Sequence, residues 1–431
     1  MEFLLFEKSL EVILASTTFV SLGLGLTGMI LWTKHCLFQN QSLLLLINED
    51  IKKEAWSRET LLNSLSRENI RIPSPCGGKG ACKQCKVKIC EGVEEPSPSD
   101  LSTFTKKEIQ SGWRLSCQYK LKKDLKIELE PQYLDVKSYK AQVKSNENVS
   151  SFIKELILEA PNVIDYRSGG YFQFHVPAYQ TLTNDWKSQI DPIYQDSWTD
   201  CGLFDQKIDF SGLEKDQIIR AYSTASYPDE GTKLMFNVRI ASPPIDRSNG
   251  KIKNDIPWGI CSSYLFSLKP GDEVDISGPY GESYMINDDR ELIFLIGGAG
   301  SSFGRSHILH LFYNENTKRK VSLWYGARSL KENIYQREYE ELAQKFENFS
   351  YHLVLSEPSI EDIEKGWAQD DPVKTAFLFQ AFEKGQLKFM DDPEDCLYFV
   401  CGPPMHNESI LKLLDDYGVE RSSIVLDDFG G

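Results

Sequence analysis

Residues 75–88 read Pro-Cys-Gly-Gly-Lys-Gly-Ala-Cys-Lys-Gln-Cys-Lys-Val-Lys, so three cysteines lie close together in a glycine-rich stretch. Cys76, Cys82 and Cys85 form a C-x5-C-x2-C pattern, and Cys117 follows at a distance in Trp-Arg-Leu-Ser-Cys-Gln. A [2Fe–2S] cluster needs four thiolates, two on each iron. A structural zinc site is the alternative, but its cysteines usually form two short pairs, and Cys117 has no such neighbour. The cysteines therefore predict a [2Fe–2S] cluster.

The composition bounds the classes of protein to which the chain can belong. With 431 residues it has room for about two to four domains, each with its own core. A net charge of −15 argues against nucleic-acid binding, which requires basic surface. The cysteines outside the cluster pattern are scattered, so we expect a reducing compartment rather than a disulfide framework.

The N-terminal segment contains an uncharged run over residues 12–32. At a rise of 1.5 Å per residue such a helix spans about 31 Å, the thickness of a bilayer core. A cleaved signal peptide is the alternative, but the charges before the run are mostly acidic and no A-x-A site follows. We expect residues 1–35 to be a retained single-pass anchor. Because Lys34, Lys52 and Lys53 follow the run, the bulk of the chain is expected in the cytoplasm.

Residues 36–130 carry the cysteines and read as a small β-grasp domain of the ferredoxin type. Residues 42–48 form an apolar run typical of a buried strand, and residues 60–67 resemble a short helix. Strands over residues 86–89 and 125–130 follow the cysteine loop.

Residues 131–288 are rich in strands and predict an antiparallel β-barrel. Gly-Tyr-Phe-Gln-Phe-His-Val at 170–176 alternates with a period of two, and a Pro-Gly turn at 270–271 precedes another strand. The polar, aromatic segment 178–210 is expected to be an insertion outside the barrel and a candidate contact surface. The expected strands are 140–143, 152–158, 170–176, 234–240 and 273–277.

Residues 289–431 alternate between strands and helices, which predicts an α/β domain with a doubly wound parallel sheet. The expected strands are 292–296, 321–325, 351–355 and 396–400, with helices from about 301, over 331–346 and over 373–384.

A tetrapeptide of the middle domain, Arg220-Ala-Tyr222-Ser223, alternates polar side chains. A flavin dinucleotide needs such a set: Arg220 for the pyrophosphate, Tyr222 against the isoalloxazine ring and Ser223 at N5 of that ring. A polar strand face without a ligand is the alternative. A Gly–Ser loop that opens a helix can offer N–H groups to the same pyrophosphate, unless it is an ordinary N-cap. The candidate residues of that loop are Gly259, Cys261 and Ser262.

Three loops of the last domain each follow an apolar strand. The Gly-Gly-Ala-Gly loop also precedes a helix, where a pyrophosphate can bind, although the full G-x-G-x-x-G with a later acid is absent. Because loops after parallel strands meet at one edge of the sheet, together they predict a nicotinamide site. The candidate contacts are Gly297, Gly298 and Gly300, then Arg328 and Ser329, then Cys401, Gly402 and Pro403.

The order of these motifs resembles the ferredoxin–NADP reductase superfamily. The anchor, the C-x5-C-x2-C loop and the ending Leu-Asp-Asp-Phe-Gly-Gly narrow the resemblance to the F subunits of bacterial sodium-translocating NADH:quinone reductases, along essentially the whole chain. The resemblance implies FAD, one [2Fe–2S] cluster and NADH oxidation. It also implies a complex with other subunits in the bacterial inner membrane, which passes electrons to a quinone while pumping sodium.

The resemblance further implies a catalytic set of Ser223, Cys401 and Phe429. In the superfamily a C-terminal aromatic residue often covers the flavin where nicotinamide must stack, which implies Phe429, with Cys401 near the nicotinamide. One departure concerns the segment after the glycine loop. The family usually has an Ala-Pro-Met-like segment there, whereas residues 301–304 are Ser-Ser-Phe-Gly. Without Pro the start of the helix is less preset.

Two other functions remain open from the residues. A reductase that feeds an oxygenase would have the same three modules, but the anchor argues against it. A membrane-anchored iron–sulfur carrier would hold no flavin, so a visible spectrum would identify it. Arg328 and Ser329 are able to contact a 2′-phosphate, so only the resemblance favours NADH over NADPH.

Overall fold

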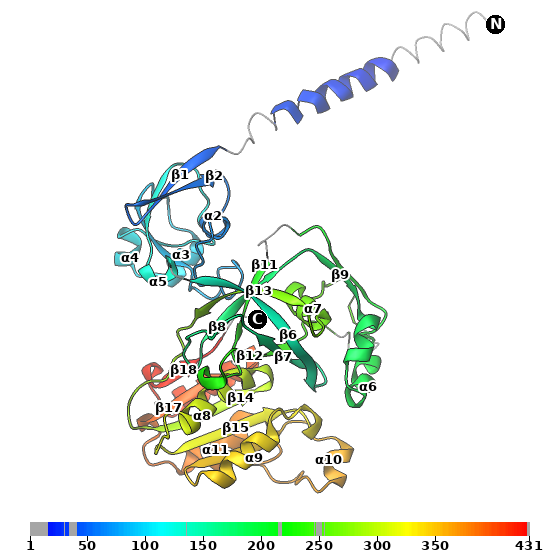
Figure 1. The fold of residues 1–431 in the computed structure, drawn as a ribbon, viewed down its shortest axis with the longest axis vertical. Helices are drawn as coiled ribbons and strands as arrows, with labels where there is room; N and C mark the ends of the chain where they lie inside the picture. Colours follow the sequence, from blue (N-terminus) through cyan, green and yellow to red (C-terminus); the bar gives the residue numbers. More distant parts are fainter. Residues whose placement is uncertain are drawn as a thin grey trace, which may run out of the picture.

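The computed structural model describes residues 16–29, 31–33, 41–134, 136–213, 218–244, 246, 252–253 and 255–428 (Figure 1). The described helix near the N-terminus stands apart from the rest, and the first domain, the antiparallel sheet and the parallel sheet follow one another. That helix, Ser16–Thr33, is long and apolar enough to cross a membrane. Residues 12–15 of the expected run lie outside the described residues.

The first domain is a mixed five-stranded sheet in the order β2-β1-β5-β3-β4. In β1, Leu43, Leu45 and Ile47 alternate inward, as the apolar run predicts. The Thr60 side chain caps the helix that leads to the cysteine loop. The elements are β1 Ser42–Ile47, β2 Ile51–Trp56, α2 Leu61–Arg67, β3 Lys86–Glu91, α3 Pro98–Thr103, α4 Lys106–Gln110, β4 Trp113–Leu115 and β5 Leu125–Glu128. Strands β2 and β4 were not expected from the sequence.

The middle domain is a six-stranded antiparallel sheet in the order β11-β8-β13-β6-β7-β12. A bridge between Thr224 and Phe236 brings its two edge strands together. Phe172, Phe174 and Phe236 pack edge to face in the core, with centroids 5.0 Å apart for the last two. The elements are β6 Lys137–Ser150, β7 Ile153–Glu159, β8 Tyr171–Val176, β11 Ile218–Ser223, β12 Lys233–Arg239, α7 Ile260–Ser267 and β13 Glu273–Tyr280. The short helix α5, Pro131–Leu134, precedes them and packs against the core of the first domain.

The insertion lies outside the six-stranded sheet, as expected, and packs against it (Figure 1). Its strands β9 (Tyr179–Leu182) and β10 (Lys207–Phe210) pair with each other. Between them lie a 3-10 helix and α6 (Pro192–Asp200), which bury Trp186 and Trp198 completely. Burial of two indole rings explains why so polar a segment is ordered on the sheet.

The last domain is a parallel sheet in the order β16-β15-β14-β17-β18. Its first strand is central, so the chain winds outward in one direction and then in the other. Ligands of such sheets bind at the carboxyl ends of the strands where the direction reverses, here between β14 and β17. The elements are β14 Glu291–Gly297, α8 Ser301–Tyr313, β15 Val321–Ala327, α9 Gln336–Lys345, β16 Phe349–Leu355, α10 Ile360–Glu364, α11 Leu378–Gly385, β17 Cys396–Cys401, α12 Pro404–Asp416 and β18 Ile424–Leu426.

Candidate functional site

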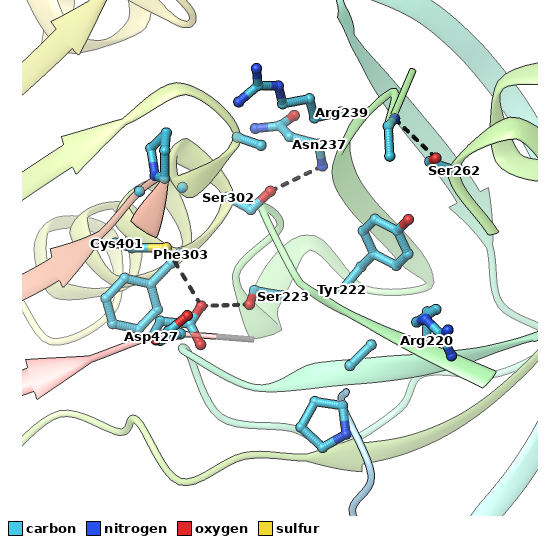
Figure 2. Close-up of a pocket in the computed structure, with 18 of the residues that line it drawn as sticks. Arg220, Tyr222, Ser223, Asn237, Arg239, Ser262, Ser302, Phe303, Cys401 and Asp427 are labelled. Carbon is cyan, nitrogen blue, oxygen red and sulfur yellow. Dashed lines mark hydrogen bonds between the residues drawn. The ribbon is translucent and has the colours of Figure 1, made fainter. Parts of the chain in front are cut away.

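A cavity of about 490 Å³ collects the motifs of all three domains (Figure 2). The cysteine loop, strand β11, the start of α7, the end of β14 and the end of β17 all contribute to its wall. The expected residues that line it are Cys76, Arg220, Tyr222, Ser223, Gly259, Cys261, Ser262, Gly297, Gly300, Cys401, Gly402 and Pro403. Motifs more than three hundred residues apart in the chain therefore surround one space.

The β11 side of the cavity supplies a cation and an aromatic ring. Arg220 and Tyr222 alternate on the strand, so both face the same side. The Tyr222 ring packs edge-on against Phe174, with centroids 5.4 Å apart. Burial raises the pKa of the Cys261 thiol to about 12 and raises that of the Tyr222 hydroxyl, so both groups are neutral at physiological pH. This wall is suited to hold the ring and phosphates of a dinucleotide.

The start of α7 is built from backbone rather than from a capping side chain. Gly259 is the N-cap, and a Cβ there would lie 2.6 Å from the Cβ of Ala241. The Ser262 hydroxyl accepts from Ala241 N at 3.1 Å and donates to Gly259 O at 3.2 Å. The alternative of an ordinary N-cap, made by Ser262 or Ser263, is wrong, because Gly259 is the N-cap and no side chain caps the helix. Without a capping side chain, backbone N–H groups of the first turn remain able to bind an anion.

A buried carboxyl group lies between two walls of the cavity. The β11 wall, with the predicted flavin motif Arg220, Tyr222 and Ser223, is called the flavin wall, and the wall at the ends of β14 and β17 is called the nucleotide wall. Ser223 Oγ donates to Asp427 Oδ2 at 2.6 Å, and Cys401 Sγ donates to the same oxygen at 3.8 Å. Burial raises the pKa of Asp427 to about 7, and burial together with this carboxyl raises the pKa of Cys401 well above its usual value. Figure 2 shows the three side chains side by side. This carboxyl can hold or release a proton near neutral pH, next to the Ser223 hydroxyl.

The glycine loop lies against the end of β17. A Cβ on Gly300 would lie 2.4 Å from the carbonyl oxygen of Cys401, so only glycine fits there. Gly297 also lines the cavity, whereas Gly298 does not; its φ of +56° shapes the turn. Gly300 caps α8 without a side chain, which again leaves backbone donors at a helix start.

Besides Gly298, two expected nucleotide contacts do not line this cavity. Arg328 pairs with Glu357 at 2.5 Å, and its side chain is 72% exposed. Ser329 is the N-cap of a short 3-10 helix and makes no capping bond with its side chain. Both still follow β15 at the carboxyl edge of the sheet. Phe429 lies outside the described residues.

The four cysteines of the cluster pattern form two pairs. Cys82 Sγ lies 3.3 Å from Cys76 Sγ, and the hydrogen bond between them lowers the pKa of Cys76 and raises that of Cys82. A second hydrogen bond joins Cys85 to Cys117; it raises the pKa of Cys85 and lowers that of Cys117. Thiolates are the metal-binding form. Two sulfur pairs fit the two irons of a [2Fe–2S] cluster.

The surroundings of the thiols also fit a cluster. Gln118 Nε2 donates to Cys117 Sγ at 3.4 Å and to Gly78 O at 3.1 Å, which supports the loop. Within the described residues, no three His, Cys, Asp or Glu side chains form a group for a single metal ion. Cys90 is exposed on β3 and lies outside the two pairs.

The cysteine loop touches the flavin wall directly. Pro75, Cys76 and Lys79 line the cavity. A Cβ on Gly77 would lie 1.7 Å from Arg220 Nη1, so the loop backbone presses against the arginine. The first and middle domains are also joined where Tyr171 Oη donates to Gln84 Oε1 at 2.8 Å. A thiol of the cluster pattern therefore borders the space that would hold a flavin.

Several residues of the cavity wall were missed by sequence reasoning. Asp427 stands in the terminal Leu-Asp-Asp-Phe-Gly-Gly, which served only as a marker of family resemblance. Asn237 and Arg239 alternate on β12, a pattern that could have indicated a polar face on a strand. The missed residues are Pro75, Lys79, Ala221, Asn237, Arg239, Ala241, Ile260, Ala299, Ser302, Phe303, Pro404, Asp427 and Asp428.

Three family models match the chain in order. The 2Fe-2S iron-sulfur cluster binding domain matches residues 47–122, the oxidoreductase FAD-binding domain residues 206–284 and the oxidoreductase NAD-binding domain residues 294–410. Each of the three matched segments contributes residues to the wall of the cavity.

Full-length relatives are known. The F subunit of the Na(+)-translocating NADH-quinone reductase of Chlamydia pneumoniae is 56% identical over 97% of this chain and 98% of its own. The protein of that name from Marinomonas sp. is 40% identical, over 98% of this chain and all of its own.

Solved structures share the fold at low sequence identity. The Amycolatopsis reductase GcoB has a TM-score of 0.59 at 18% identity, covering 90% of this chain and 98% of its own. The ferredoxin reductase in carbazole 1,9a-dioxygenase has a TM-score of 0.57 at 18% identity, covering 91% and 99%. The fold is thus that of a ferredoxin reductase with a cluster domain.

Proposed function

Because the chain belongs to the family of the F subunits of Na(+)-translocating NADH-quinone reductases, we propose that it is the NADH-oxidising, electron-input component of a sodium-pumping NADH:quinone reductase. FAD, a [2Fe–2S] cluster and NADH are its cofactors and electron donor, in agreement with the three family models. The match to the FAD-binding model argues against the alternative function of an iron–sulfur carrier without flavin. The names of the relatives argue against the other alternative, a reductase that feeds an oxygenase.

One observation carries this proposal: a single cavity is lined by the cluster loop, the flavin motif and the nucleotide loops. A flavin held there would supply the conversion of a two-electron hydride into single electrons, which is what a one-electron cluster requires of its donor. Cys76 borders one end of the space and Cys401 another, so no protein relay is needed between donor and cluster. The task of the chain is therefore to orient the groups and tune their environment.

The residues around the cavity take distinct roles in this proposal. Arg220 binds the pyrophosphate, Tyr222 packs on the isoalloxazine ring and Ser223 bonds its N5. Asp427 accepts a hydrogen bond from the Ser223 hydroxyl, and this bond is stronger when the carboxyl is ionised than when it is protonated. Cys401 lies near the nicotinamide. The N-terminal turns of α7 and α8 supply backbone donors for the phosphates.

The remaining candidate contacts complete the proposed site. Arg328 and Ser329 contact the outer part of the dinucleotide, beyond the cavity, and Phe429 covers the flavin until nicotinamide stacks there. Gly259, Cys261, Ser262, Gly297, Gly298, Gly300, Gly402 and Pro403 provide close backbone approach. Cys76, Cys82, Cys85 and Cys117 are the cluster ligands.

The proposal divides the chain into an anchor (1–35), a [2Fe–2S] domain (36–130), a flavin-binding antiparallel barrel (131–288) and a doubly wound NADH-binding domain (289–431). The bridge between Thr224 and Phe236 supports closure of the barrel. The helix Ser16–Thr33 would cross the bacterial inner membrane once, with the redox domains on the cytoplasmic side. There the protein would pass electrons to partner subunits and finally to quinone.

A truncation tests this division of labour. A chain that begins near Gln39 should fold, bind both cofactors and reduce a soluble artificial acceptor with NADH at nearly the rate of the full chain. The same truncation should fail to support quinone reduction in the assembled membrane complex. Loss of flavin from the truncated chain would contradict the domain assignment, and full quinone reduction would contradict a coupling role for the anchor.

A further inference from the structure

The start of α8 lacks the usual local signals for a helix N-terminus. Gly300 is the N-cap and makes no side-chain bond, and the first turn contains Ser301 and Ser302 instead of a proline. A capping side chain or an N1 proline normally sets the position of the first turn. The glycine loop over residues 297–300 leads directly into this turn, so its position must be set by contacts from elsewhere.

Asn237, on the flavin-side strand β12, makes those contacts. Its Nδ2 donates to Ser301 Oγ at 2.7 Å, and its backbone N donates to Ser302 Oγ at 3.0 Å. All three residues are buried, with at most 4% of each exposed. Figure 2 shows the bond between Ser302 and Asn237 at the edge of the cavity. The first turn of α8 is thus tied to the strand of another domain.

Tyr335 holds the other end of the Asn237 amide. Its hydroxyl, which has one hydrogen, is shared between Asn237 Oδ1 and Glu155 Oε2, each 2.7 Å away, and the residue adopts a left-handed backbone conformation with φ of +63°. Buried amides that are bonded at both ends have one preferred orientation, because an unpaired end would be costly. Asn237 therefore acts as a rigid link.

The next turn of α8 adds further polar contacts to the middle domain, and together these contacts form a seam between α8 and that domain. Arg305 pairs with Glu338 at 2.7 Å and with Glu230 at 3.2 Å, and Ser306 Oγ donates to Ser226 O at 2.8 Å. Glu230 and Ser226 belong to the middle domain, so polar contacts hold α8 to it over two turns. Directional bonds specify an orientation more sharply than apolar contact does.

We propose that Asn237 is a positioning residue, whose bonds to Ser301, Ser302 and Tyr335 hold the glycine loop in register with the flavin wall before NADH binds. This inference rests on the proposed function, because it concerns how NADH meets the flavin. Hydride transfer requires reacting atoms about 3–3.5 Å apart, and a misplacement of about 1 Å can lower the rate a hundredfold. The loop that would carry the NADH pyrophosphate is joined by this link to the strand next to the flavin.

Two substitutions weaken the link without changing the cavity wall, because neither Ser301 nor Tyr335 lines it. Ser301→Ala removes one partner of Asn237, and Tyr335→Phe removes the other. Hydrogen–deuterium exchange of residues 297–304, in the full chain with FAD and without NADH, should become faster in each variant. Flavin bleaching at saturating NADH should slow by about tenfold to a hundredfold. FAD content and the cluster EPR signal should not change.

Matched variants separate positioning from general stability. Ser306→Ala removes a seam bond one turn later, and Tyr351→Phe removes a bond to Asn333 inside the last domain. Both should change exchange of residues 297–304 and the bleaching rate less than Ser301→Ala and Tyr335→Phe do, because neither lost bond reaches the first turn of α8. Ser301→Thr keeps the hydroxyl and should restore both. Because Ser301→Ala and Tyr335→Phe act on the same amide, the double variant should be little worse than either single one.

The outcomes distinguish the link from the function on which it rests. Unchanged exchange and bleaching in both Ser301→Ala and Tyr335→Phe would overturn the inference, as would equal effects of Ser306→Ala or fully additive effects in the double variant. If NADH does not bleach the flavin of the unmodified protein, the proposed function fails. The exchange measurement would still decide whether Asn237 orders the loop.

Discussion

Replacing Asp427 with asparagine should remove a pH dependence that this buried carboxyl imposes on the folded protein. Burial raises its pKa from the ordinary 3.8 to about 7, against the opposing effects of the hydrogen bonds from Ser223 and Cys401. At 1.36 kcal/mol per pKa unit, the folded protein loses about 4 kcal/mol when this group ionises, relative to the unfolded chain.

The sign of the effect follows from the direction of the shift. Between about pH 4 and pH 7 the folded protein retains a proton on Asp427 that the unfolded chain has released. The stability is therefore fully present below pH 4 and is lost as the pH rises through about 7. Asparagine cannot ionise, so Asp427→Asn should equal the unmodified protein near pH 4 and exceed it by up to about 4 kcal/mol at pH 8.

The measurement is urea unfolding at a series of pH values, with FAD in excess. Release of flavin fluorescence follows the opening of the cavity, to which all three domains contribute. Asp416→Asn, an exposed acid paired with Lys412 at 2.8 Å, is the control and should keep the pH dependence of the unmodified protein. Parallel stability curves for Asp427→Asn and the unmodified protein between pH 4 and pH 8 would refute the reasoning.

A kinetic readout on the same variant tests the link between Asp427 and Ser223. The ionised carboxylate accepts a hydrogen bond from the Ser223 hydroxyl at 2.6 Å, so this O–H points toward Asp427. Flavin bleaching by NADH should show an inflection near pH 7 in the unmodified protein, and Asp427→Asn should lose it. The same inflection in both proteins would assign it to another group.

Three further predictions follow from the site. Cys117→Ala should abolish the normal cluster EPR signal because it removes one of four thiolates, whereas Cys90→Ala should retain it; a normal spectrum in Cys117→Ala would exclude that ligand. Arg220→Ala should weaken FAD binding by about 1.5–3 kcal/mol, roughly tenfold to a hundredfold, with the cluster intact, and full FAD occupancy at unchanged affinity would count against the assignment. Phe429→Ala should alter NADH affinity or the rate of flavin bleaching, and values equal to those of the unmodified protein would rule out its proposed place over the flavin.

The features that were predicted correctly from the sequence depend mostly on local patterns. The apolar strands of the parallel sheet, the cysteine spacing and the glycine loop each depend on residues that are neighbours in the chain. Arg220, Tyr222 and Ser223 reach the cavity because a strand places them with a period of two. Arg328 shows the limit of such reasoning, since nothing near it in sequence indicates that Glu357 pairs with it.

The sequence by itself determined most of the strands and helices and which segments carry the cysteines, the glycines and the flavin motif, because periodicity and spacing act over a few residues. Only the tertiary structure decided which side chains meet. Asp427 and Ser223 are 204 positions apart, and Asn237 and Ser301 are 64 apart, so no local pattern relates them. The raised pKa of Asp427 likewise comes from burial between domains, a property of the folded surroundings that no stretch of sequence contains.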